Sequence, residues 1–390
     1  MALMKMKDVC LKIGSGATPR GGKEAYIDSG ISLIRSQNVL DFGFTYDGLA
    51  HINEQQAEKL NNVIVESGDV LLNITGDSVA RVCMVEDEVL PARVNQHVAI
   101  VRANKEIVLG SYILYFLQMS KPYLLQLAAG GATRNALTKG MIEDLEIEIP
   151  YIQEQKRIVS LLDDIQRKIR VNEGINDNLE QQAKLVFNEW INTCTEKCAI
   201  SELSDNILDY TPIAQGMVRL LNSSDVTEGV FPMTPLVPNE DLKGHFKKRF
   251  QFGDILYSEI RPRNHHYGFV QFDASEYIAS TRLMVIRARE DKVSPAILYQ
   301  YLLLPDVEAE FTLKTESRSG TFPQGNYADM SSIVVPYASL EKQEDISATL
   351  TSIRQFIATK QYENQQLAEL RDALLPKLMS GKLDVSNLDI

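Results

Sequence analysis

The sequence repeats much of its framework once, at an offset of about 185 to 188 residues. Gly68-Asp69-Val70-Leu71 returns as Gly253-Asp254-Ile255-Leu256, and Pro150-Tyr151 returns as Pro336-Tyr337. A fixed period constrains the architecture of a chain more strongly than a local motif does. Two copies are too few for a solenoid. The repeat therefore predicts two homologous modules, each a globular part followed by a helix.

The globular parts are expected to combine short strands with short helices. Residues 1–150 alternate brief apolar runs with Gly, Asp, Asn and Pro turn signals. Residues 111–118 and 122–129 have a helical pattern. We therefore expect the α+β class, with two homologous domains at residues 1–150 and 199–336. Each would hold a curved, mostly antiparallel sheet and short helices.

Two segments between and after these domains, residues 151–198 and 337–390, show the 4-3 apolar spacing of a coiled coil. The expected seam positions are Ile158, Leu162, Ile165, Ile169, Asn176, Leu179, Ile346, Leu350, Ile353, Ile357, Asn364 and Leu367. Paired antiparallel, two helices of roughly 50 Å would separate the domains as a pseudo-twofold spacer. That length corresponds to about 15 base pairs. The alternative is that each helix merely packs on its own domain.

The composition narrows the class of protein but does not show whether nucleic acid is its partner. The net charge of −12 argues against nucleic acid, although DNA binding requires only a local basic face. No apolar run approaches the roughly 20 residues of a membrane span. The four cysteines are scattered and suggest no disulfide framework. We expect a cytoplasmic prokaryotic protein.

Motifs for catalysis are missing from the sequence. The segment from Gly16 to Lys23 is glycine-rich, but its spacing does not match a phosphate-binding loop. Cys194 and Cys198 have no second Cys or His pair nearby, so a structural zinc site is not expected. The pair His265-His266 has no evident carboxylate partner and is better explained as a surface loop. We expect a non-catalytic protein that binds no metal.

Polar and basic segments fall at related positions in the two halves, and they differ more than the apolar framework does. Arg pairs with guanine, Asn and Gln with adenine, and Lys or Arg with phosphate. Two copies that recognise different base sequences should diverge in this way, although loops diverge in any duplicated protein. The candidate DNA-binding residues are Arg20, Lys23, Arg35, Thr75, Ser78, Arg81, Arg93, Asn95, Gln96, Arg134, Asn135, Lys247, Lys248, Arg249, Arg261, Arg263, Asn264, Arg282, Arg318 and Gln324.

Several of these segments resemble the specificity subunit of Type I restriction–modification systems. They are Gly68-Asp69-Val70-Leu71-Leu72-Asn73-Ile74-Thr75-Gly76, Val94-Asn95-Gln96-His97-Val98-Ala99-Ile100 and Ile149-Pro150-Tyr151-Ile152-Gln153-Glu154-Gln155. Residues 253–262, 340–346 and 374–383 also resemble that family, so the resemblance covers essentially the whole chain. Arg371 replaces Ala183 on the second seam, which departs from uniform packing.

The resemblance implies two target recognition domains that each recognise half of a split DNA sequence, with paired helices setting the spacing. It also implies two modification subunits that bind S-adenosylmethionine and methylate adenine, and restriction subunits that use ATP and Mg²⁺. This chain would bind none of these cofactors. Two alternatives stay open: the specificity subunit of a stand-alone DNA adenine methyltransferase, and a coiled-coil protein–protein adaptor. The acidity of the chain favours the adaptor.

Overall fold

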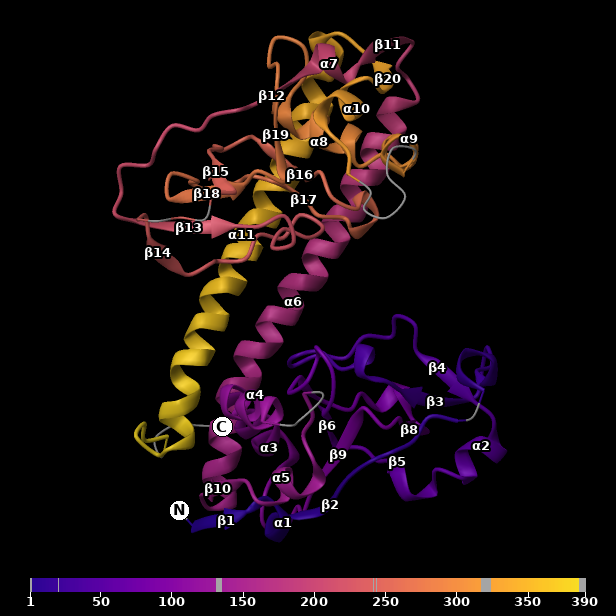
Figure 1. Cartoon of the computed structure of the whole chain (residues 1–390), viewed down its shortest axis with the longest axis vertical. Helices are drawn as coiled ribbons and strands as arrows, with labels where there is room; N and C mark the ends of the chain where they lie inside the picture. Colours follow the sequence, from indigo (N-terminus) through magenta and orange to yellow (C-terminus); the bar gives the residue numbers. More distant parts are fainter. Residues whose placement is uncertain are drawn as a thin grey trace. The chain divides into compact units, whose positions relative to one another are not determined.

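The computed structural model describes residues 2–19, 21–130, 135–240, 242, 244–316 and 324–385, with residues 22 and 23 described by their backbone alone. The chain forms two compact units (Figure 1). Unit 1 contains Met1–Lys168 and Leu367–Ile390, and unit 2 contains Ile169–Gln366. Each unit joins one globular domain to part of both long helices. The domain limits expected at residues 150, 198 and 336 stay predictions, because the units are divided within the helices instead.

The first half of the chain runs from β1 to the long helix α6. Its strands are β1 (Ala2–Lys5), β2 (Cys10–Ser15), β3 (Ile31–Ile34), β4 (Ala50–Ile52), β5 (Ile64–Val65), β6 (Val70–Asn73), β7 (Val82–Met84), β8 (Ala92–Val94), β9 (Val98–Ala103) and β10 (Glu146–Ile149). Its α-helices are α1 (Met6–Val9), α2 (Glu54–Glu58), α3 (Gly110–Met119), α4 (Lys121–Ala129), α5 (Lys139–Glu143) and α6 (Ile152–Ile191). Its 3-10 turns are η1 (Gly22–Ala25), η2 (Ser36–Asn38), η3 (Asn61–Val63) and η4 (Asp87–Val89).

The second half runs from β11 to the long helix α11. Its strands are β11 (Glu196–Ala199), β12 (Ser204–Asn206), β13 (Met217–Leu221), β14 (Leu236–Pro238), β15 (Phe246–Lys248), β16 (Ile255–Ser258), β17 (Tyr267–Phe269), β18 (Tyr277–Ser280), β19 (Leu283–Ala288) and β20 (Val334–Tyr337). Its helices are α7 (Ile200–Leu203), α8 (Pro295–Leu302), α9 (Pro305–Glu316), α10 (Tyr327–Ser331) and α11 (Leu340–Met379), with one 3-10 turn, η5 (Pro262–Asn264).

The strand order of the first half returns element by element in the second. Unit 1 has four-stranded sheets in the order β2-β9-β6-β7 and β4-β3-β8-β5, and unit 2 has β12-β19-β16-β17 and β14-β13-β18-β15. A two-stranded sheet completes each domain, β1-β10 in unit 1 and β11-β20 in unit 2. Pairing is antiparallel except between β3 and β8 and between β13 and β18. The α+β class and the internal duplication are therefore confirmed.

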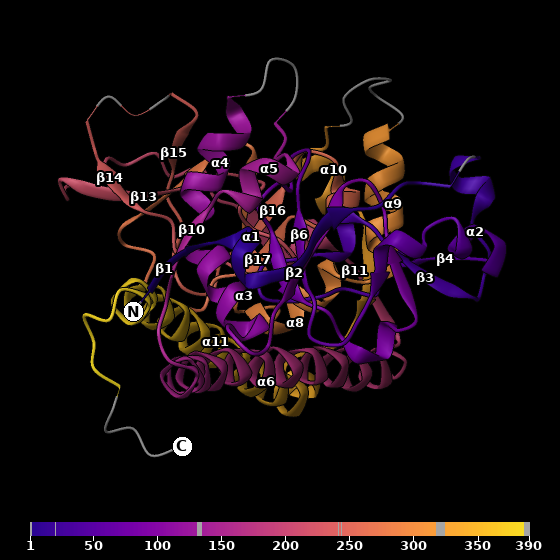
Figure 2. The same ribbon diagram turned by 90° about the horizontal axis from the view of Figure 1, so that it is seen from below.

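The expected single curved sheet is divided into layers, because its central strands bury both faces. In β6, Val70 and Leu72 face a core that contains α3, whereas Leu71 faces the sheet of β3 and β8. Figure 2 shows β3 and β4 on the side of β6 that lies away from α3. In β16, Leu256 likewise packs with the second sheet of unit 2, while its neighbours pack on α8. Such strands appear in sequence as continuous apolar runs rather than as alternation.

The repeated Gly-Asp pair has a structural role that is the same in both units. Gly68 and Gly253 have φ of 85° and 88°, a conformation that glycine adopts without strain. The carboxylate of Asp69 accepts hydrogen bonds from Arg102 Nε at 2.7 Å, from Arg102 Nη2 at 2.8 Å and from the Glu66 backbone N–H at 2.7 Å.

Asp254 accepts from Arg287 Nε at 2.7 Å, from Arg287 Nη2 at 2.9 Å and from the Gln251 backbone N–H at 2.8 Å. We call these two arrangements the Asp–Arg clasps. Each one joins the two central strands of its sheet, β6 to β9 in unit 1 and β16 to β19 in unit 2.

A buried glutamine fixes the start of each long helix to its domain. Gln155 Nε2 donates to the carbonyl oxygens of Ile107 and Pro150, both at 2.9 Å, and Gln155 Oε1 accepts from the Leu109 N–H at 2.9 Å. Gln343 Nε2 donates in the same way to Lys292 and Ala338, at 2.9 and 2.8 Å. Among the described residues, the Gln343 side-chain oxygen has no partner.

The two long helices pair antiparallel within each unit. In unit 2, Arg354 bonds Glu180, Trp190 Nε1 donates to the Lys342 carbonyl at 3.1 Å, and Asn172 Nδ2 donates to Asn364 Oδ1 at 2.8 Å. In unit 1, Arg371 Nη1 donates to Gln166 Oε1 at 2.8 Å. No helix in the described part of the chain has a stretch long and apolar enough to span a membrane.

The seam positions expected from the sequence are all buried or half-buried, and Ile158, Leu162, Ile346 and Leu350 belong to the cores of their domains. Buried positions are Ile158, Leu162, Ile165, Ile169, Ile346, Leu350 and Ile357, and half-buried ones are Asn176, Leu179, Ile353, Asn364 and Leu367. The repeat places Asn176 and Asn364 at the same position in the two copies, but these two residues do not pair with each other. Asn364 bonds Asn172 instead. At the position that departs from the repeat, the Arg371 guanidinium lies 4.0 Å from the ring centroid of Phe42.

Candidate nucleic-acid interface

In unit 1, three segments distant in sequence meet beyond the ends of β6 and β9. We call residues 74–81, 95–97 and 135–137 edge 1. The Ile74 N–H donates to the His97 carbonyl oxygen at 2.9 Å, and the Leu137 N–H donates to the Ile74 carbonyl oxygen at 2.8 Å. The Gly76 N–H donates to the Asn135 carbonyl oxygen at 3.3 Å. Edge 1 lies at the opposite end of β6 and β9 from the Asp–Arg clasp.

Polar side chains of edge 1 form one connected chain of hydrogen bonds with Thr18, which lies outside the three segments. Thr18 Oγ1 donates to Gln96 Oε1. Gln96 Nε2 lies 3.0 Å from His97 Nε2, and His97 Nδ1 lies 2.5 Å from Thr75 Oγ1. Asn95 is only 4% exposed, and its Oδ1 accepts the His97 N–H at 2.9 Å. Asn95 therefore shapes the loop, while the Gln96 side chain is exposed.

Unit 2 brings the equivalent segments together. We call residues 258–266, 281–283 and 324–326 edge 2. The Glu259 N–H donates to the Arg282 carbonyl oxygen at 2.9 Å, and the Gly325 N–H donates to the Glu259 carbonyl oxygen at 2.8 Å. The Ser258 N–H donates to the His266 carbonyl oxygen at 2.8 Å. Edge 2 lies at the opposite end of β16 and β19 from the second clasp.

The main turn of both edges has the same backbone despite its different sequence. Gly76 and Ala80 have φ of 79° and 66°, and the equivalent Arg261 and His265 have φ of 47° and 54°. A left-handed conformation costs a non-glycine residue on the order of 1 kcal/mol. Arg261 and His265 therefore occupy positions that local preference disfavours. Strained residues of this kind are concentrated at functional sites.

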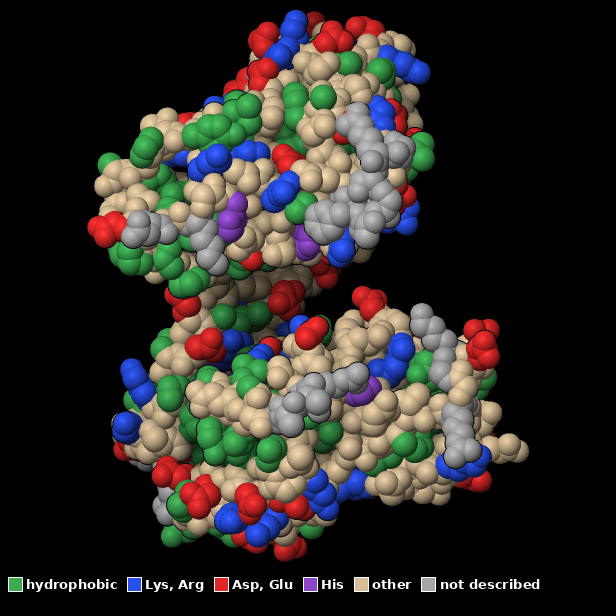
Figure 3. Space-filling model, viewed as in Figure 1, with side chains coloured by type: hydrophobic (Ala, Val, Ile, Leu, Met, Phe, Trp, Pro, Cys, Tyr) green, Lys and Arg blue, Asp and Glu red, His purple; other side chains and the backbone are tan. Residues whose placement is uncertain are grey.

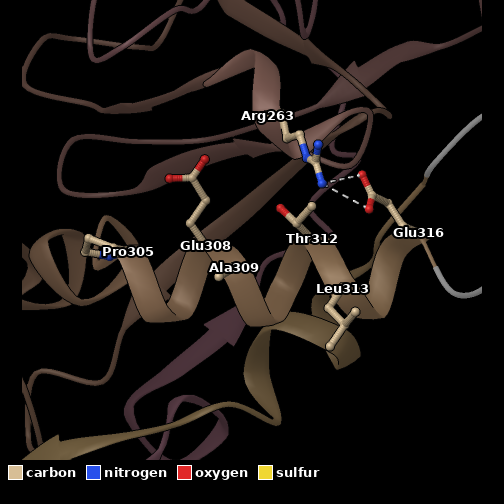
Figure 4. Close-up of a pocket in the computed structure, with 7 residues that line it drawn as sticks. All are labelled: Arg263, Pro305, Glu308, Ala309, Thr312, Leu313 and Glu316. Atoms are coloured by element: carbon tan, nitrogen blue, oxygen red, sulfur yellow. Dashed lines mark hydrogen bonds and ion pairs between the residues drawn. The ribbon is translucent and has the colours of Figure 1, made fainter.

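Charged contacts surround the turn of edge 2. His265 Nδ1 lies 3.0 Å from Glu228 Oε1, and His265 Nε2 lies 2.8 Å from Glu308 Oε1. These carboxylates, that of Glu228 first, raise the pKa of His265. Arg263 Nη2 lies 3.1 Å from Glu316 Oε1 and 3.2 Å from Oε2, beside a surface pocket of about 380 Å³ (Figure 4). Ion pairs on η5 and α9 thus hold the turn in place.

Most predicted residues at the two edges are at least partly accessible. In edge 1 they are Thr75, Ser78, Arg81, Gln96 and Asn135, and in edge 2 they are Arg261, Arg263, Asn264, Arg282 and Gln324. Edge 2 holds three arginines and edge 1 holds one. Figure 3 shows Lys and Arg side chains on the visible face of both units, interspersed with Asp and Glu.

Other predicted residues lie away from the edges or have different partners. Arg35 donates to the Gly48 carbonyl oxygen and lies 5.3 Å from the Tyr26 ring centroid. Lys247 is exposed, and its Nζ lies 5.2 Å from the Tyr210 ring centroid. Arg249 is half-buried beside the same segment. Arg20, Arg134 and Arg318 lie outside the described residues, as does the side chain of Lys23.

Arg93 and Lys248 correct the sequence expectation, because both are buried. Arg93 is 8% exposed and donates to the Ala57 carbonyl oxygen at 3.3 Å and to Asn61 Oδ1 at 3.2 Å. Lys248 is 4% exposed and donates to the Leu283 carbonyl oxygen at 2.7 Å. Burial lowers the pKa of Lys248, and Glu259, with Oε1 at 3.7 Å, opposes that shift. Both cations stabilise their own domain and are withdrawn from the candidate interface.

His97 and Glu259 are edge residues with side-chain contacts that were not among the predicted ones. His97 lies in the middle of the polar chain of edge 1. Glu259 lies between Lys248 Nζ and Gln324 Nε2, at 3.7 and 3.4 Å in edge 2. The repeat held a usable signal for His97, since the offset of 185 aligns it with the predicted Arg282. The described residues contain no group of three or more His, Cys, Asp or Glu side chains that could hold a metal ion.

Comparisons with known proteins identify relatives along the whole chain. The model of the Type I restriction modification DNA specificity domain matches residues 1–181 and 232–369. The Type I restriction enzyme HindI specificity subunit of Haemophilus influenzae is 36% identical over 179 residues, which are 45% of this chain and 39% of that protein. The putative MjaX specificity subunit of Methanocaldococcus jannaschii is 21% identical over 98% of this chain and 93% of its own length.

A solved structure shows the same fold. It is the crystal structure of the Type I restriction-modification system S subunit from M. genitalium, with a TM-score of 0.57. The two chains are 12% identical, and the match covers 97% of this chain and 95% of the other. At that identity the likeness concerns the fold alone.

Proposed function

The chain belongs to the Type I restriction modification DNA specificity family, and from that premise we propose that it recognises a bipartite DNA sequence for a Type I complex. Edge 1 would recognise one half-site and edge 2 the other. Specificity domains recognise sequence and leave the chemistry to other subunits. We therefore propose that this chain carries no catalytic residue.

One observation carries the proposal: two equivalent frameworks present different side chains at equivalent places. The Asp–Arg clasps, the strand order and the backbone of the turn recur in both units. The accessible side chains do not recur, since Gln96 and His97 of edge 1 align with Thr281 and Arg282 of edge 2. Base edges in the major groove are distinguished by such donor and acceptor patterns. Two different patterns on one framework suit two different half-sites.

The proposal extends to partner subunits. Two modification subunits would bind S-adenosylmethionine and methylate adenine, and restriction subunits would use ATP and Mg²⁺. The cofactors would be held by those partners. The two sets of edge residues support binding to DNA, and family membership supports assembly with other subunits.

We also propose that α6 and α11 set the distance between the two half-sites. Both helices are 40 residues long, which corresponds to about 60 Å of helix. The number of residues in a continuous helix determines its length, because its rise per residue is fixed. The Asn172–Asn364 contact supports a fixed register, as buried asparagines do in coiled coils.

Selection from a randomised duplex library with the full chain tests this function. We expect one consensus with two separated half-sites, and an affinity that falls steeply as salt rises, because phosphate contacts release counterions. As a matched control, the buried Lys248→Met should leave the salt slope unchanged, whereas Arg282→Gln should reduce it by about 0.9. Binding without sequence preference, or no binding at low salt, would contradict the proposal.

The same selection tests the spacing. Removing one heptad from α6 and the facing heptad from α11 shortens the helix pair by about 10 Å, or roughly three base pairs. We expect the half-sites to stay the same and the number of bases between them to fall. An unchanged spacer in a folded variant would overturn the role of the helices and leave DNA recognition intact.

A further inference from the structure

The polar chain of edge 1 contacts both ends of one amide, that of Gln96. Nε2 of Gln96 can only donate, so Nε2 of His97, at 3.0 Å, must accept. The ring of His97 then carries its proton on Nδ1, which donates to Thr75 Oγ1 at 2.5 Å. At the other end, Thr18 Oγ1 donates to Gln96 Oε1. Both ends of the Gln96 amide therefore have a hydrogen-bond partner in this chain of contacts.

These contacts leave the Gln96 amide with one donor and one acceptor. An amide nitrogen carries two hydrogens and an amide oxygen two lone pairs, and the chain uses one of each. Gln96 is exposed on edge 1, whereas the amide of Asn95 is buried and bonded to the loop. Thr75 already contacts His97. Gln96 is thus the exposed side chain of this chain of contacts, and it keeps one donor and one acceptor for a ligand.

We propose that Gln96 recognises an adenine in one half-site, and that His97 is the positioning residue that fixes the direction of its amide. This inference rests on the proposed function and names the base that edge 1 recognises. Adenine offers N7 as an acceptor and its N6 amino group as a donor in the major groove, which matches the remaining donor and acceptor of the amide. Guanine offers two acceptors at the same places, so its O6 would face the amide oxygen.

Edge 2 has no equivalent of this arrangement. The offset of 185 aligns Gln96 with Thr281 and His97 with Arg282. Arg282 is exposed, and its backbone N–H lies 3.3 Å from Ser280 Oγ. The effect of changing Gln96 is therefore confined to one half-site, and the other half-site serves as an internal control for folding and for overall DNA affinity.

The test is selection from the randomised library with the full chain and a set of single variants. Gln96→Ala should relax one A·T position of one half-site by roughly tenfold or more and leave the other half-site unchanged. Gln96→Glu has acceptors only, so it should replace adenine at that position by cytosine, whose N4 amino group donates. A new preference cannot arise from a misfolded protein. Gln55→Ala, at an exposed position on α2 outside edge 1, is the matched control and should leave the position unchanged.

Base analogues then identify the groups that are contacted. 7-Deazaadenine lacks the N7 acceptor, so at the assigned position it should weaken binding of the unchanged protein about tenfold and have no effect on Gln96→Ala. His97→Gln supplies an acceptor oxygen and should keep the preference. His97→Lys can only donate, so the Gln96 amide should turn and the preference for adenine should be lost.

Several outcomes would overturn the inference while the proposed function stands. They are an unchanged consensus with Gln96→Ala, relaxation at a G·C pair, no effect of 7-deazaadenine, or relaxation caused by Gln55→Ala as well. An unchanged preference with His97→Lys would overturn the positioning role alone. If the unchanged protein selected no sequence at all, the proposed function would fall and this inference with it.

Discussion

Edge 1 and edge 2 occupy the same place on the same framework, yet one is mostly neutral and the other is charged. Edge 1 contains the hydrogen-bonded chain of Thr18, Gln96, His97 and Thr75. Edge 2 holds Arg261, Arg263 and Arg282, and its turn is fixed by carboxylates of Glu228, Glu308 and Glu316. Exposed ion pairs weaken as salt rises, because ions in solution screen the charges. The framework is common to both units, and chemistry differs where a ligand would bind.

The largest expected effect comes from the two Asp–Arg clasps. It tests whether they contribute equally to the stability of their units, as their similar geometry suggests. Asp69→Ala and Asp254→Ala each remove a carboxylate that accepts three hydrogen bonds and leave a partly buried guanidinium. Breaking such a pair costs about 3–5 kcal/mol. Since the Arg287 side chain is 35% exposed against 18% for Arg102, we expect Asp254→Ala near the lower limit.

Hydrogen exchange measured by mass spectrometry reports the stability of each unit separately. Asp28→Ala, at an exposed position, is the control and should change stability by less than about 0.5 kcal/mol. A large loss in one unit and none in the other would show that the clasps are not equivalent.

A smaller difference is expected at the two helix starts. Gln155→Ala removes three hydrogen bonds and Gln343→Ala removes two. At about 1 kcal/mol for each bond, the free energy of unfolding should fall by about 3 and about 2 kcal/mol. Urea titration of both variants measures the difference. Equal losses, or a larger one for Gln343→Ala, would contradict the ranking of the two glutamines by their number of hydrogen bonds.

The smallest effect concerns His265 of edge 2, which lies between two carboxylates. His97 of edge 1 instead contacts Gln96 and Thr75. Glu228 and Glu308 raise its folded pKa above the ordinary value of 6.5. The stabilisation is therefore complete below about pH 6.5 and is lost as pH rises through the folded pKa. The side chain is 39% exposed, so solvent screening limits the contribution to below about 1 kcal/mol.

Melting temperatures of the unchanged protein and of His265→Gln, compared from pH 5.5 to 8.5, check this sign. The difference should be largest at the acid end and shrink toward pH 8.5. A difference that grows with pH would contradict the assignment of the two carboxylates as partners of His265.

The sequence predicted what depends on local pattern. The duplication located both Gly-Asp pairs and both helix starts, because these features recur with nearly the same residues. The sequence did not show which Lys and Arg side chains are buried and which are exposed. Arg93 lies in a three-residue strand whose residues are all buried, so alternation gave no warning.

The register between the two long helices could not be predicted from the sequence either. The repeat relates Asn364 to Asn176, but antiparallel pairing places Asn364 against Asn172. That contact depends on how residues almost 200 positions apart align. The left-handed conformation of Arg261 is likewise imposed by the surrounding fold, since arginine has no preference for it. Only the equivalent Gly76 carried a local signal for that turn.

The placement of each Asp–Arg clasp has a consequence for how such a protein evolves. The clasp ties two central strands at one end, and the variable side chains lie at the other end of the same strands. A substitution at Gln96 or Arg282 therefore leaves the anchoring of its strands untouched. New specificities can be explored with little risk to folding, and each half can change independently of the other. Because the clasp and the variable side chains lie at opposite ends of the same strands, the edges can accept substitutions without loss of stability.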